Sequence, residues 1–482
     1  MKLFVVFKPW ILCLLAISCY HSTTYAYDNL PSLGGNAFSE LTPEKEKQLG
    51  DIMMRQTRGQ LPMVYDPLMD EYINALGNKM VARANDVNFP FKFYWIQDKN
   101  INGFASLGGN IASHTGTIAI AESESEFASV ISHEIAHVTQ RHIARYVEAR
   151  SQQAPLTLAG LLGAIVLATV NPEAGMAAIA ATQGAAQQSA INFTRSNEQE
   201  ADRIGMQVLA ESGFDPYAVP DFFRKLTEKS RFVNQQLAFL QTHPLSQSRV
   251  SDTRLRAEQF TKRFVPDSQD FTLVQARVLA RYHYDKQHSE ALFLKKLGQP
   301  GGNTKANQYG LAIALLDNKK LAESQEIIEK LLLDDKHNLY YIDVYTDILI
   351  AQGKHQQSLD MLEKEYLLRP NNQVVTLNYA NAAMSAKAYR LAIHLLKTLL
   401  FYKEDNILAY GMLIDAYQAM EDLPRLYEAR ANVSYQLANY PKAIDYIDEA
   451  INYLQPEEKL EARRLVAKKK QLQAEYSRIQ RM

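Results

Sequence analysis

Apolar residues recur at helical spacing through most of the chain, but short strand-like runs interrupt this pattern before residue 265. The predicted helices are Pro43–Arg58, Pro67–Ala84, Glu124–Arg150 and Glu198–Ser212, and the predicted strands lie within Phe91–Gln97 and Asn102–Ala121. Helices around a few short strands predict an α+β domain with one small sheet, over residues 27–264.

Beyond residue 270 the pattern becomes almost wholly helical and repeats itself. Three similar segments end at Asn338, Asn372 and Asn406, so each repeat is 34 residues long. Paired helices with this period resemble the tetratricopeptide repeat, which implies an all-α solenoid over residues 270–482. A later segment that begins at Tyr440 leaves the register, which predicts an extra helix before it. Such stacks form a concave groove for partner segments; the alternative is a helical bundle without a binding role.

The first residues have the pattern of an export signal. Lys2 and Lys8 supply positive charge, an apolar run follows from Trp10 to Ile17, and small residues occupy the two positions that a signal peptidase reads. We predict a signal peptide over residues 1–26, cleaved after Ala26. The alternatives are an uncleaved membrane anchor and lipidation at Cys19.

Cleavage would remove both cysteines of the chain, Cys13 and Cys19. The mature chain then forms no disulfide, and any metal ion must be held by His, Asp or Glu. Export and the absence of thiols favour the periplasm. The chain has 52 basic and 53 acidic residues, a balance that argues against a nucleic-acid partner.

Leu156–Val170 is a run of fifteen residues without charge, and an alanine-rich run follows it to Ala190. Fifteen residues are fewer than the roughly 20 that a membrane-spanning helix needs. We predict a helical hairpin that is buried or covers the active site. The alternative is peripheral contact with a membrane through Leu156–Val170.

The stretch HEIAH places His133 and His137 four residues apart, with Glu134 directly after the first. Residues at i and i+4 share one face of a helix, so both imidazoles can reach one zinc ion. Glu134 then lies beside the metal, where it can hold the water that the metal acidifies. The alternative is a solvent-exposed helix that happens to carry two histidines.

A catalytic zinc usually has three protein ligands and an open position. A second helix is predicted to open near Ser196 or Asn197, with Glu198 and Asp202 on one face. We predict that Glu198 is the third ligand and that Asp202 accepts the N–H of a ligand histidine. Glu200 is the rival ligand, and an ion pair with an arginine is the alternative role for Asp202.

HEIAH followed by EQEAD resembles the zinc metallopeptidases that include the HtpX heat-shock protease and the CAAX prenyl proteases. The family pattern, H-E-x-x-H and then E-x-x-x-D, falls on His133, Glu134, His137, Glu198 and Asp202. The resemblance implies a zincin-type metalloprotease domain of the gluzincin kind, with one Zn²⁺ per chain. Mn²⁺, Co²⁺ and Fe²⁺ are the alternatives that these ligand types allow.

Two further stretches carry the resemblance. Ile101–Gly116 matches the segment before the family's catalytic helix, although Gly103 replaces an alanine, and THPLSQSR matches a downstream His-Pro…Arg element. This element suggests that Arg249 stabilises the oxyanion and that His243 acts directly, for example in zinc's open position in a resting state. The alternative for His243 is a structural loop histidine.

His142 and His114 are expected to be structural, because neither has partners at ligand spacing.

With the leader and the repeats, the chain resembles a periplasmic member of this family. That implies an endopeptidase that degrades misassembled outer-membrane β-barrel proteins and assists their assembly, with the repeats bound to clients or to the outer-membrane assembly machinery. A glycine-broken edge strand within Asn102–Gly116 would align the substrate as an added strand. The rival function is a periplasmic chaperone or adaptor whose zinc site is latent.

Overall fold

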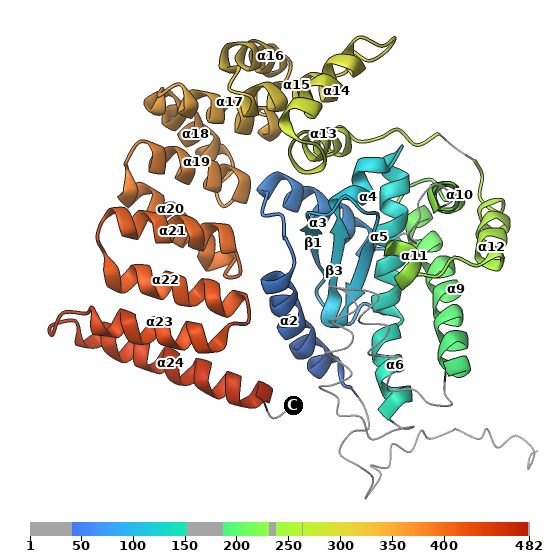
Figure 1. Cartoon of the computed structure of the whole chain (residues 1–482), viewed down its shortest axis with the longest axis horizontal. Helices are drawn as coiled ribbons and strands as arrows, with labels where there is room; N and C mark the ends of the chain where they lie inside the picture. The colour runs from blue at the N-terminus through green and yellow to red at the C-terminus, as the bar shows by residue number, and fades with distance from the viewer. Residues whose placement is uncertain (1–40, 152–186, 231–237, 263, 481–482) are drawn as a thin grey trace, which may run out of the picture. The chain divides into compact units, whose positions relative to one another are not determined.

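The computed structural model describes residues 41–151, 187–230, 238–262 and 264–480 (Figure 1). The predicted signal peptide and the charge-free run Leu156–Val170 lie outside the described residues. In the part of the chain that is described, no helix has both the length and the hydrophobicity that a membrane crossing requires.

A three-stranded sheet forms the centre of the first part of the chain. Its strands are β1 (Lys92–Ile96), β2 (Gly103–Ser106) and β3 (Asn110–His114). The central strand β3 is parallel to β1 and antiparallel to β2, so β2 lies at an edge. The small sheet predicted from the sequence is therefore confirmed.

Nine described helices surround this sheet or follow it. They are α2 (Pro43–Gln60), α3 (Pro67–Val81), α4 (Thr115–Ile120), α5 (Glu124–Thr139), α6 (His142–Ser151), α9 (Gln187–Glu211), α10 (Ala218–Ser230), α11 (Ala238–Thr242) and α12 (Gln247–Ala257). The side chains of Thr42, Asp66 and Ser123 accept backbone N–H groups at the starts of α2, α3 and α5. Local capping thus fixes where these helices begin.

The structure corrects two of the predicted helices. The predicted helix Glu124–Arg150 is broken into α5 and α6, because Arg141 adopts a left-handed conformation with φ of 51°. Its side chain binds Glu46 and the carbonyl of Leu41, which stabilises the break. The second helix, α9, already includes Gln187, so Ser196 and Asn197 lie inside it and do not cap it. Its packing along α5 overrides their preference for caps.

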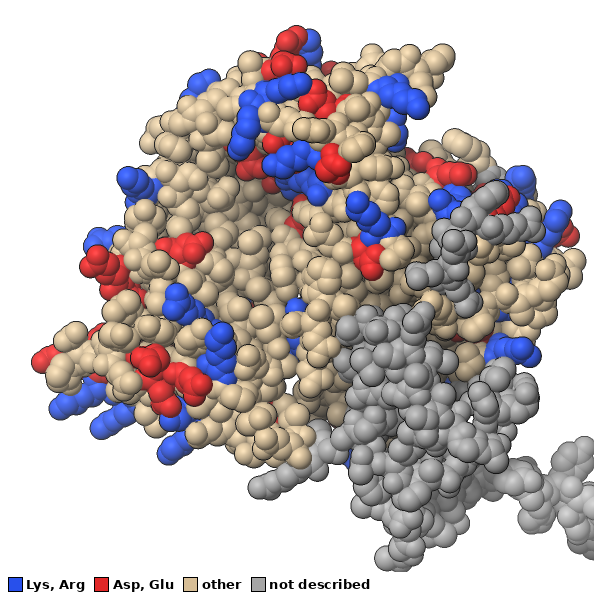
Figure 2. All heavy atoms as spheres, in the orientation of Figure 1, with Lys and Arg blue, Asp and Glu red and all other residues tan. Residues whose placement is uncertain are grey.

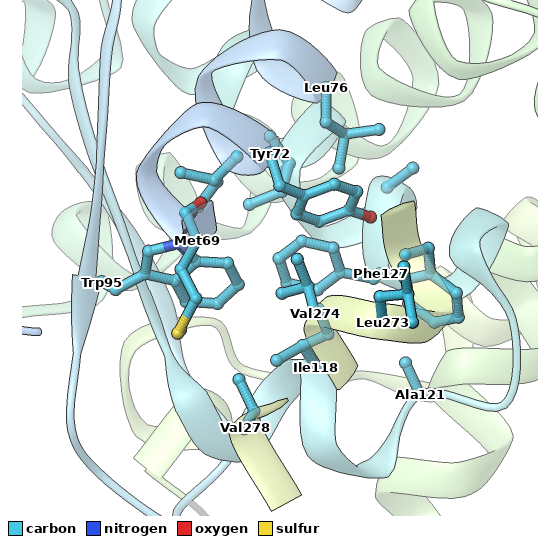
Figure 3. Close-up of a cluster of buried hydrophobic side chains, with 14 of the residues drawn as sticks. Met69, Tyr72, Leu76, Trp95, Ile118, Ala121, Phe127, Leu273, Val274 and Val278 are labelled. Carbon is cyan, nitrogen blue, oxygen red and sulfur yellow. Dashed lines mark hydrogen bonds between the residues drawn. The ribbon is translucent and has the colours of Figure 1, made fainter. Parts of the chain in front are cut away.

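The main core lies between the sheet, α3 and α5, and the repeat region contributes to it. The rings of Trp95 and Phe127 stack 5.4 Å apart, and the Trp95 indole N–H donates to the carbonyl of Met69 at 2.9 Å. Leu273 and Val274, from the first helix of the repeats, are fully buried in the same cluster (Figure 3). The two parts of the chain therefore share one hydrophobic core.

From residue 269 the chain forms paired helices (Figure 1). They are α13 (Gln269–Val278), the π-helical turn η2 (Leu279–His283), α14 (Lys286–Leu297), α15 (Lys305–Asp317), α16 (Leu321–Asp334), α17 (Leu339–Ala351), α18 (His355–Leu368), α19 (Gln373–Ser385), α20 (Tyr389–Tyr402), α21 (Ile407–Ala419), α22 (Leu423–Gln436), α23 (Tyr440–Asn452) and α24 (Lys459–Gln480). Asn338, Asn372 and Asn406 cap the first helices of three pairs, which start 34 residues apart. The expected repeat of helical pairs is confirmed.

The extra helix expected before Tyr440 is absent from the described residues, and that prediction was wrong. Tyr440 begins α23, the first helix of a pair, whereas the tyrosine with which it was aligned, Tyr389, begins α20, the second helix of a pair. The spacing of one and a half repeats is therefore the ordinary offset between the two helix types. The alternation continues through α24.

Polar contacts also join the repeats to the first part of the chain. The buried Arg277 guanidinium binds Asp66 at 2.5 Å and Asp343 at 2.7 Å, and Arg55 binds Glu475 at 3.1 Å. On the face drawn in Figure 2, basic and acidic side chains are interspersed, in line with the balanced composition.

Candidate metal centre

Four side chains from three segments converge beside α5. His133 and His137 come from α5, Glu198 from α9 and His243 from the loop after α11, and one ligand atom from each lies within 4.8 Å of the others. The Nε2 atoms of His133 and His137 are 3.0 Å apart, and Nδ1 of His243 is 3.2 Å from Glu198. The three predicted ligands meet, and His243 joins them.

The close packing of α9 on α5 brings Glu198 to the histidines. Gly205, two turns after Glu198, permits this approach. A Cβ atom at Gly205 would lie 3.0 Å from the carbonyl oxygen of Ser132 and 3.1 Å from the backbone of His133. Any side chain there would push the two helices apart, and with them the ligands that they carry.

Glu134 faces the same cluster without a hydrogen-bond partner among the described residues. Its side chain is 1% exposed, and both carboxylate oxygens are buried and unsatisfied. Oε1 lies 3.3 Å from Nε2 of His243. An orphaned buried carboxylate is costly unless another group satisfies it. A metal-bound water would do so, and the residues therefore fit a metal ion.

Asp202 and Arg249 support the cluster from behind. Asp202 Oδ1 lies 3.1 Å from Nδ1 of His133, which directs the Nε2 of that ring towards the ligand group. Arg249 donates two hydrogen bonds of 2.7 Å to Asp202 and also contacts Glu198 at 2.8 Å. A further hydrogen bond of 2.9 Å joins Arg249 to the carbonyl of Pro244, next to His243. The guanidinium thus holds ligands in place, which favours positioning over the expected oxyanion role.

The electrostatics of the cluster favour a bound cation. Burial lowers the pKa of His133, but hydrogen bonds with Asp202 and Glu198 outweigh it and raise that pKa to about 10. Burial opposes ionisation of Glu198, but His243 and His133 hold its pKa well below the ordinary value. Burial lowers the pKa of His137 well below its ordinary value. Asp202 and Glu198 thus stabilise a positive charge at His133, whether a proton or a metal ion carries it, and the neutral ring of His137 offers a lone pair.

The structure places Glu200 outside the ligand group. Its Oε2 lies 3.1 Å from Nε2 of His142 and 2.6 Å from Arg145, and His142 Nδ1 is 2.8 Å from Nδ1 of His137. His142 therefore has partners at the site. The sequence did not reveal them, because His142 is the fifth residue after His137 and a continuous helix would point the two side chains apart.

His114 lies away from this site, with its Nδ1 3.6 Å from Asp98, and its structural role stays a prediction.

The comparisons with known proteins agree with this geometry. Residues 67–257 match the model of peptidase family M48. The chain is 41% identical over 392 residues to the beta-barrel assembly-enhancing protease of Yersinia pestis, with 81% of each chain covered. It is 39% identical over 430 residues to the protein of that name from Escherichia coli (strain K12), covering 89% of this chain and 86% of the relative.

A more distant relative is a mitochondrial protein. The chain is 24% identical over 244 residues to the mitochondrial metalloendopeptidase OMA1 of Schizosaccharomyces pombe, covering 48% of this chain and 66% of the relative. All four residues of the metal-ligand cluster lie within residues 67–257, which match the family model. On this evidence the chain belongs to the beta-barrel assembly-enhancing proteases of peptidase family M48 and is a metalloendopeptidase.

Proposed function

We propose that this chain is a zinc-dependent endopeptidase of the periplasm, which degrades misassembled outer-membrane β-barrel proteins and assists their assembly. The observation that carries the proposal is the convergence of His133, His137, Glu198 and His243 beside the orphaned carboxylate of Glu134. A ligand set of imidazoles and one carboxylate suits zinc, with Mn²⁺, Co²⁺ and Fe²⁺ as alternatives. Relatives named for β-barrel assembly support the choice of client.

Each residue of the site has its own role in the proposed peptide hydrolysis. His133, His137 and Glu198 would hold the metal, which when bound would lower the pKa of a water to about 7 and would polarise the scissile carbonyl. Glu134 accepts the proton of the attacking water and donates it to the leaving amine. Its buried carboxylate is suited to this exchange, because no described side chain or backbone group hydrogen-bonds its oxygens. Asp202 accepts the Nδ1–H of His133 and so fixes the tautomer of that ring.

Strand β2 is the element that would align the substrate. It pairs with β3 on one side and lies at the edge of the described sheet. A Cβ atom at Gly103, its first residue, would lie 3.8 Å from Cγ of Glu134, so the edge begins beside the proposed base. An extended peptide added to this edge would be read through its backbone, a mode that favours unpaired β segments.

His243 is proposed as a fourth ligand that keeps the site closed at rest. Its Nδ1 lies 3.3 Å from Nε2 of His133, and its ring stacks on Phe239 at 4.8 Å. In this proposal a peptide reaches the metal position only after the loop that carries His243 moves.

The repeat region is proposed to bind clients or the outer-membrane assembly machinery. A cleft of about 850 Å³ lies between α2 and β1 on one side and α19, α21, α22 and α24 on the other. Its size is within the range of ligand sites, and helical repeats commonly bind partner segments on such inner surfaces. Residues 270–482 are proposed to form this repeat domain and residues 27–264 the peptidase domain.

Export by a signal peptide over residues 1–26 is part of the proposal. The apolar pattern of this leader and the absence of cysteine from the rest of the chain support it. The membrane-contact alternative for Leu156–Val170 would appear as liposome binding that is lost when this run is deleted.

The proposal is tested by the metal content of the purified mature chain, measured by elemental mass spectrometry beside a Glu198→Gln variant. About one zinc per wild-type chain is expected, with clear loss in the variant. Glu134→Gln should retain the metal and lose cleavage of an unfolded β-barrel protein. No zinc in the reconstituted wild type, or cleavage by Glu134→Gln, would contradict the assignment.

Client maturation in cells distinguishes the proposed peptidase function from the chaperone alternative. If the Glu134→Gln variant supports maturation of outer-membrane β-barrel proteins as well as the wild type does, then the repeats and not the peptidase provide that function. Loss of maturation in the variant would favour the peptidase.

A further inference from the structure

Behind the ligand histidine His137 lies a chain of three more polar side chains. The Nδ1 atom of His137 is 2.8 Å from Nδ1 of His142, and Nε2 of His142 is 3.1 Å from Oε2 of Glu200. Arg145 then donates to the same Glu200 oxygen at 2.6 Å. His142 is 3% exposed, so this contact to His137 is shielded from water.

Valence fixes the proton positions along this chain. His137 directs its Nε2 towards the ligand group, where the nitrogen must offer a lone pair to a metal. A neutral ring with a free Nε2 carries its proton on Nδ1, so His137 donates to Nδ1 of His142. His142 must then carry its own proton on Nε2, which donates to Glu200. Each ring is therefore held in one tautomer.

The second ligand histidine has a similar arrangement. Nδ1 of His133 contacts Asp202 directly at 3.1 Å, and Arg249 binds the same carboxylate. In both cases an imidazole N–H is directed at a carboxylate that an arginine holds. The difference is that one more imidazole, His142, stands between His137 and its carboxylate. A buried contact of this kind orients a ligand and strengthens its donation to metal.

We propose that His142 and Glu200 are positioning residues of the metal centre, which fix the ring orientation and tautomer of His137. The inference rests on the proposed metal site and extends it, because neither residue belongs to the ligand group. Arg145 assists by holding Glu200. The oxygen of Glu200 thus supports the metal through two imidazoles instead of binding it.

The helix break at Arg141 makes this arrangement geometrically feasible. In a continuous helix the fifth residue after His137 would point away from it. The left-handed backbone of Arg141 ends α5 and starts α6 at His142, which turns the imidazole back towards α5. The Arg141 side chain binds Glu46 across the protein, so the break is fixed by a tertiary contact.

Metal affinity tests the proposal, measured by competition with a chelator on the mature chain loaded with Zn²⁺. His142→Leu removes both hydrogen bonds and should weaken binding about 10- to 100-fold. His142→Gln offers an amide oxygen to His137 and an amide N–H to Glu200, and should recover most of the affinity. Glu200→Gln keeps an acceptor but loses the charge, and should give a smaller loss than His142→Leu.

A second measurement distinguishes a change in the position of the ligand His137 from a loss of fold stability. The visible spectrum of the Co²⁺-loaded protein reports ligand geometry, and it should change in His142→Leu but not in His142→Gln. His114→Leu is the matched control, because His114 is also a buried histidine, 6% exposed, but lies outside the ligand group. It should leave affinity and spectrum unchanged, while thermal unfolding verifies that each variant is folded.

Wild-type affinity and an unchanged spectrum in folded His142→Leu would overturn the inference and leave the metal site intact. So would equal losses in His142→Gln and His142→Leu, because packing alone would then explain both. If His142→Leu does not fold, the comparison of His142→Gln and Glu200→Gln with His114→Leu decides. A wild-type chain that binds no metal would overturn the proposed function and this inference together.

Discussion

Arg249 and Asp202 form a bidentate ion pair in the interior, with two hydrogen bonds of 2.7 Å. Both side chains are at most 2% exposed. The pair contacts the three segments that carry the cluster, because Asp202 contacts His133 and Arg249 contacts Glu198 and the carbonyl of Pro244, next to His243. Ligands from separate segments are thus held through one arginine.

Removing one member of this pair should destabilise the fold strongly. Arg249→Leu leaves Asp202 and Glu198 with an uncompensated buried charge, and the free energy of unfolding should fall by about 3–5 kcal/mol. Urea denaturation measures it. Arg256→Leu is the matched control, because its pair with Asp252 is about a third exposed at both ends, and should cost at most about 1 kcal/mol. Equal effects of the two substitutions would contradict the structural role of Arg249.

The close contact of α9 with α5 at Gly205 gives a second prediction. In Gly205→Ala the new methyl group meets the backbone of Ser132 and His133 at 3.0–3.1 Å, so the backbone of one helix must shift by a few tenths of an ångström. We expect a loss of about 1–3 kcal/mol in unfolding free energy and a lower zinc content. Gly411→Ala is the control, since nothing lies within 4 Å of its Cβ position in α21. That variant should be as stable as the wild type or more so.

The features that the sequence predicted correctly are those that depend on residues close together in the chain. The shared face of His133 and His137 follows from helix geometry, the 34-residue period is visible in the repeated segments, and the structure contains both. The interactions of Arg249 with Glu198, and of His142 with His137, depend on how distant or broken segments come together. No local pattern reveals that Arg141 adopts a left-handed conformation, because Glu46, which stabilises it, lies 95 residues away.

Asp347 in the repeats predicts a pH dependence of stability. Partial burial, and next the nearby Asp343, raise its pKa to about 7 from an ordinary value near 3.8, although Arg281 at 3.7 Å partly opposes the rise. The folded state therefore binds this proton more tightly than the unfolded state. Its contribution is most favourable below pH 3.8 and is lost as the pH rises towards 7.

Asp347→Asn removes this titration, so the variant should be more stable than the wild type at pH 8. The advantage should shrink as the pH falls through this window. Urea denaturation at several pH values measures both. The substitution also removes the 3.7 Å ion contact of Asp347 with Arg281, but Arg281 keeps its contact with Asp317 at 3.4 Å. A difference between the two proteins that does not change with pH would contradict the assignment.

His243 provides the prediction that bears most directly on activity. If it occupies the open position of the metal at rest, His243→Ala should retain about one zinc per chain, because His133, His137 and Glu198 remain. The position for water then becomes free, and Glu134 loses the imidazole that lies 3.3 Å from its Oε1. Cleavage of an unfolded β-barrel protein, followed by gel electrophoresis, should therefore be faster than in the wild type.

The double variant His243→Ala with Glu134→Gln tests whether faster cleavage by His243→Ala uses the freed metal position and Glu134 as the base. It should bind zinc and cleave nothing, because the open position is free but no base remains. Slower cleavage by His243→Ala with full zinc content would mean that His243 acts on the substrate and does not block the site. Loss of zinc from His243→Ala would mean instead that the imidazole is a permanent ligand, and a coordination site for water would have to arise by expansion of the metal's coordination.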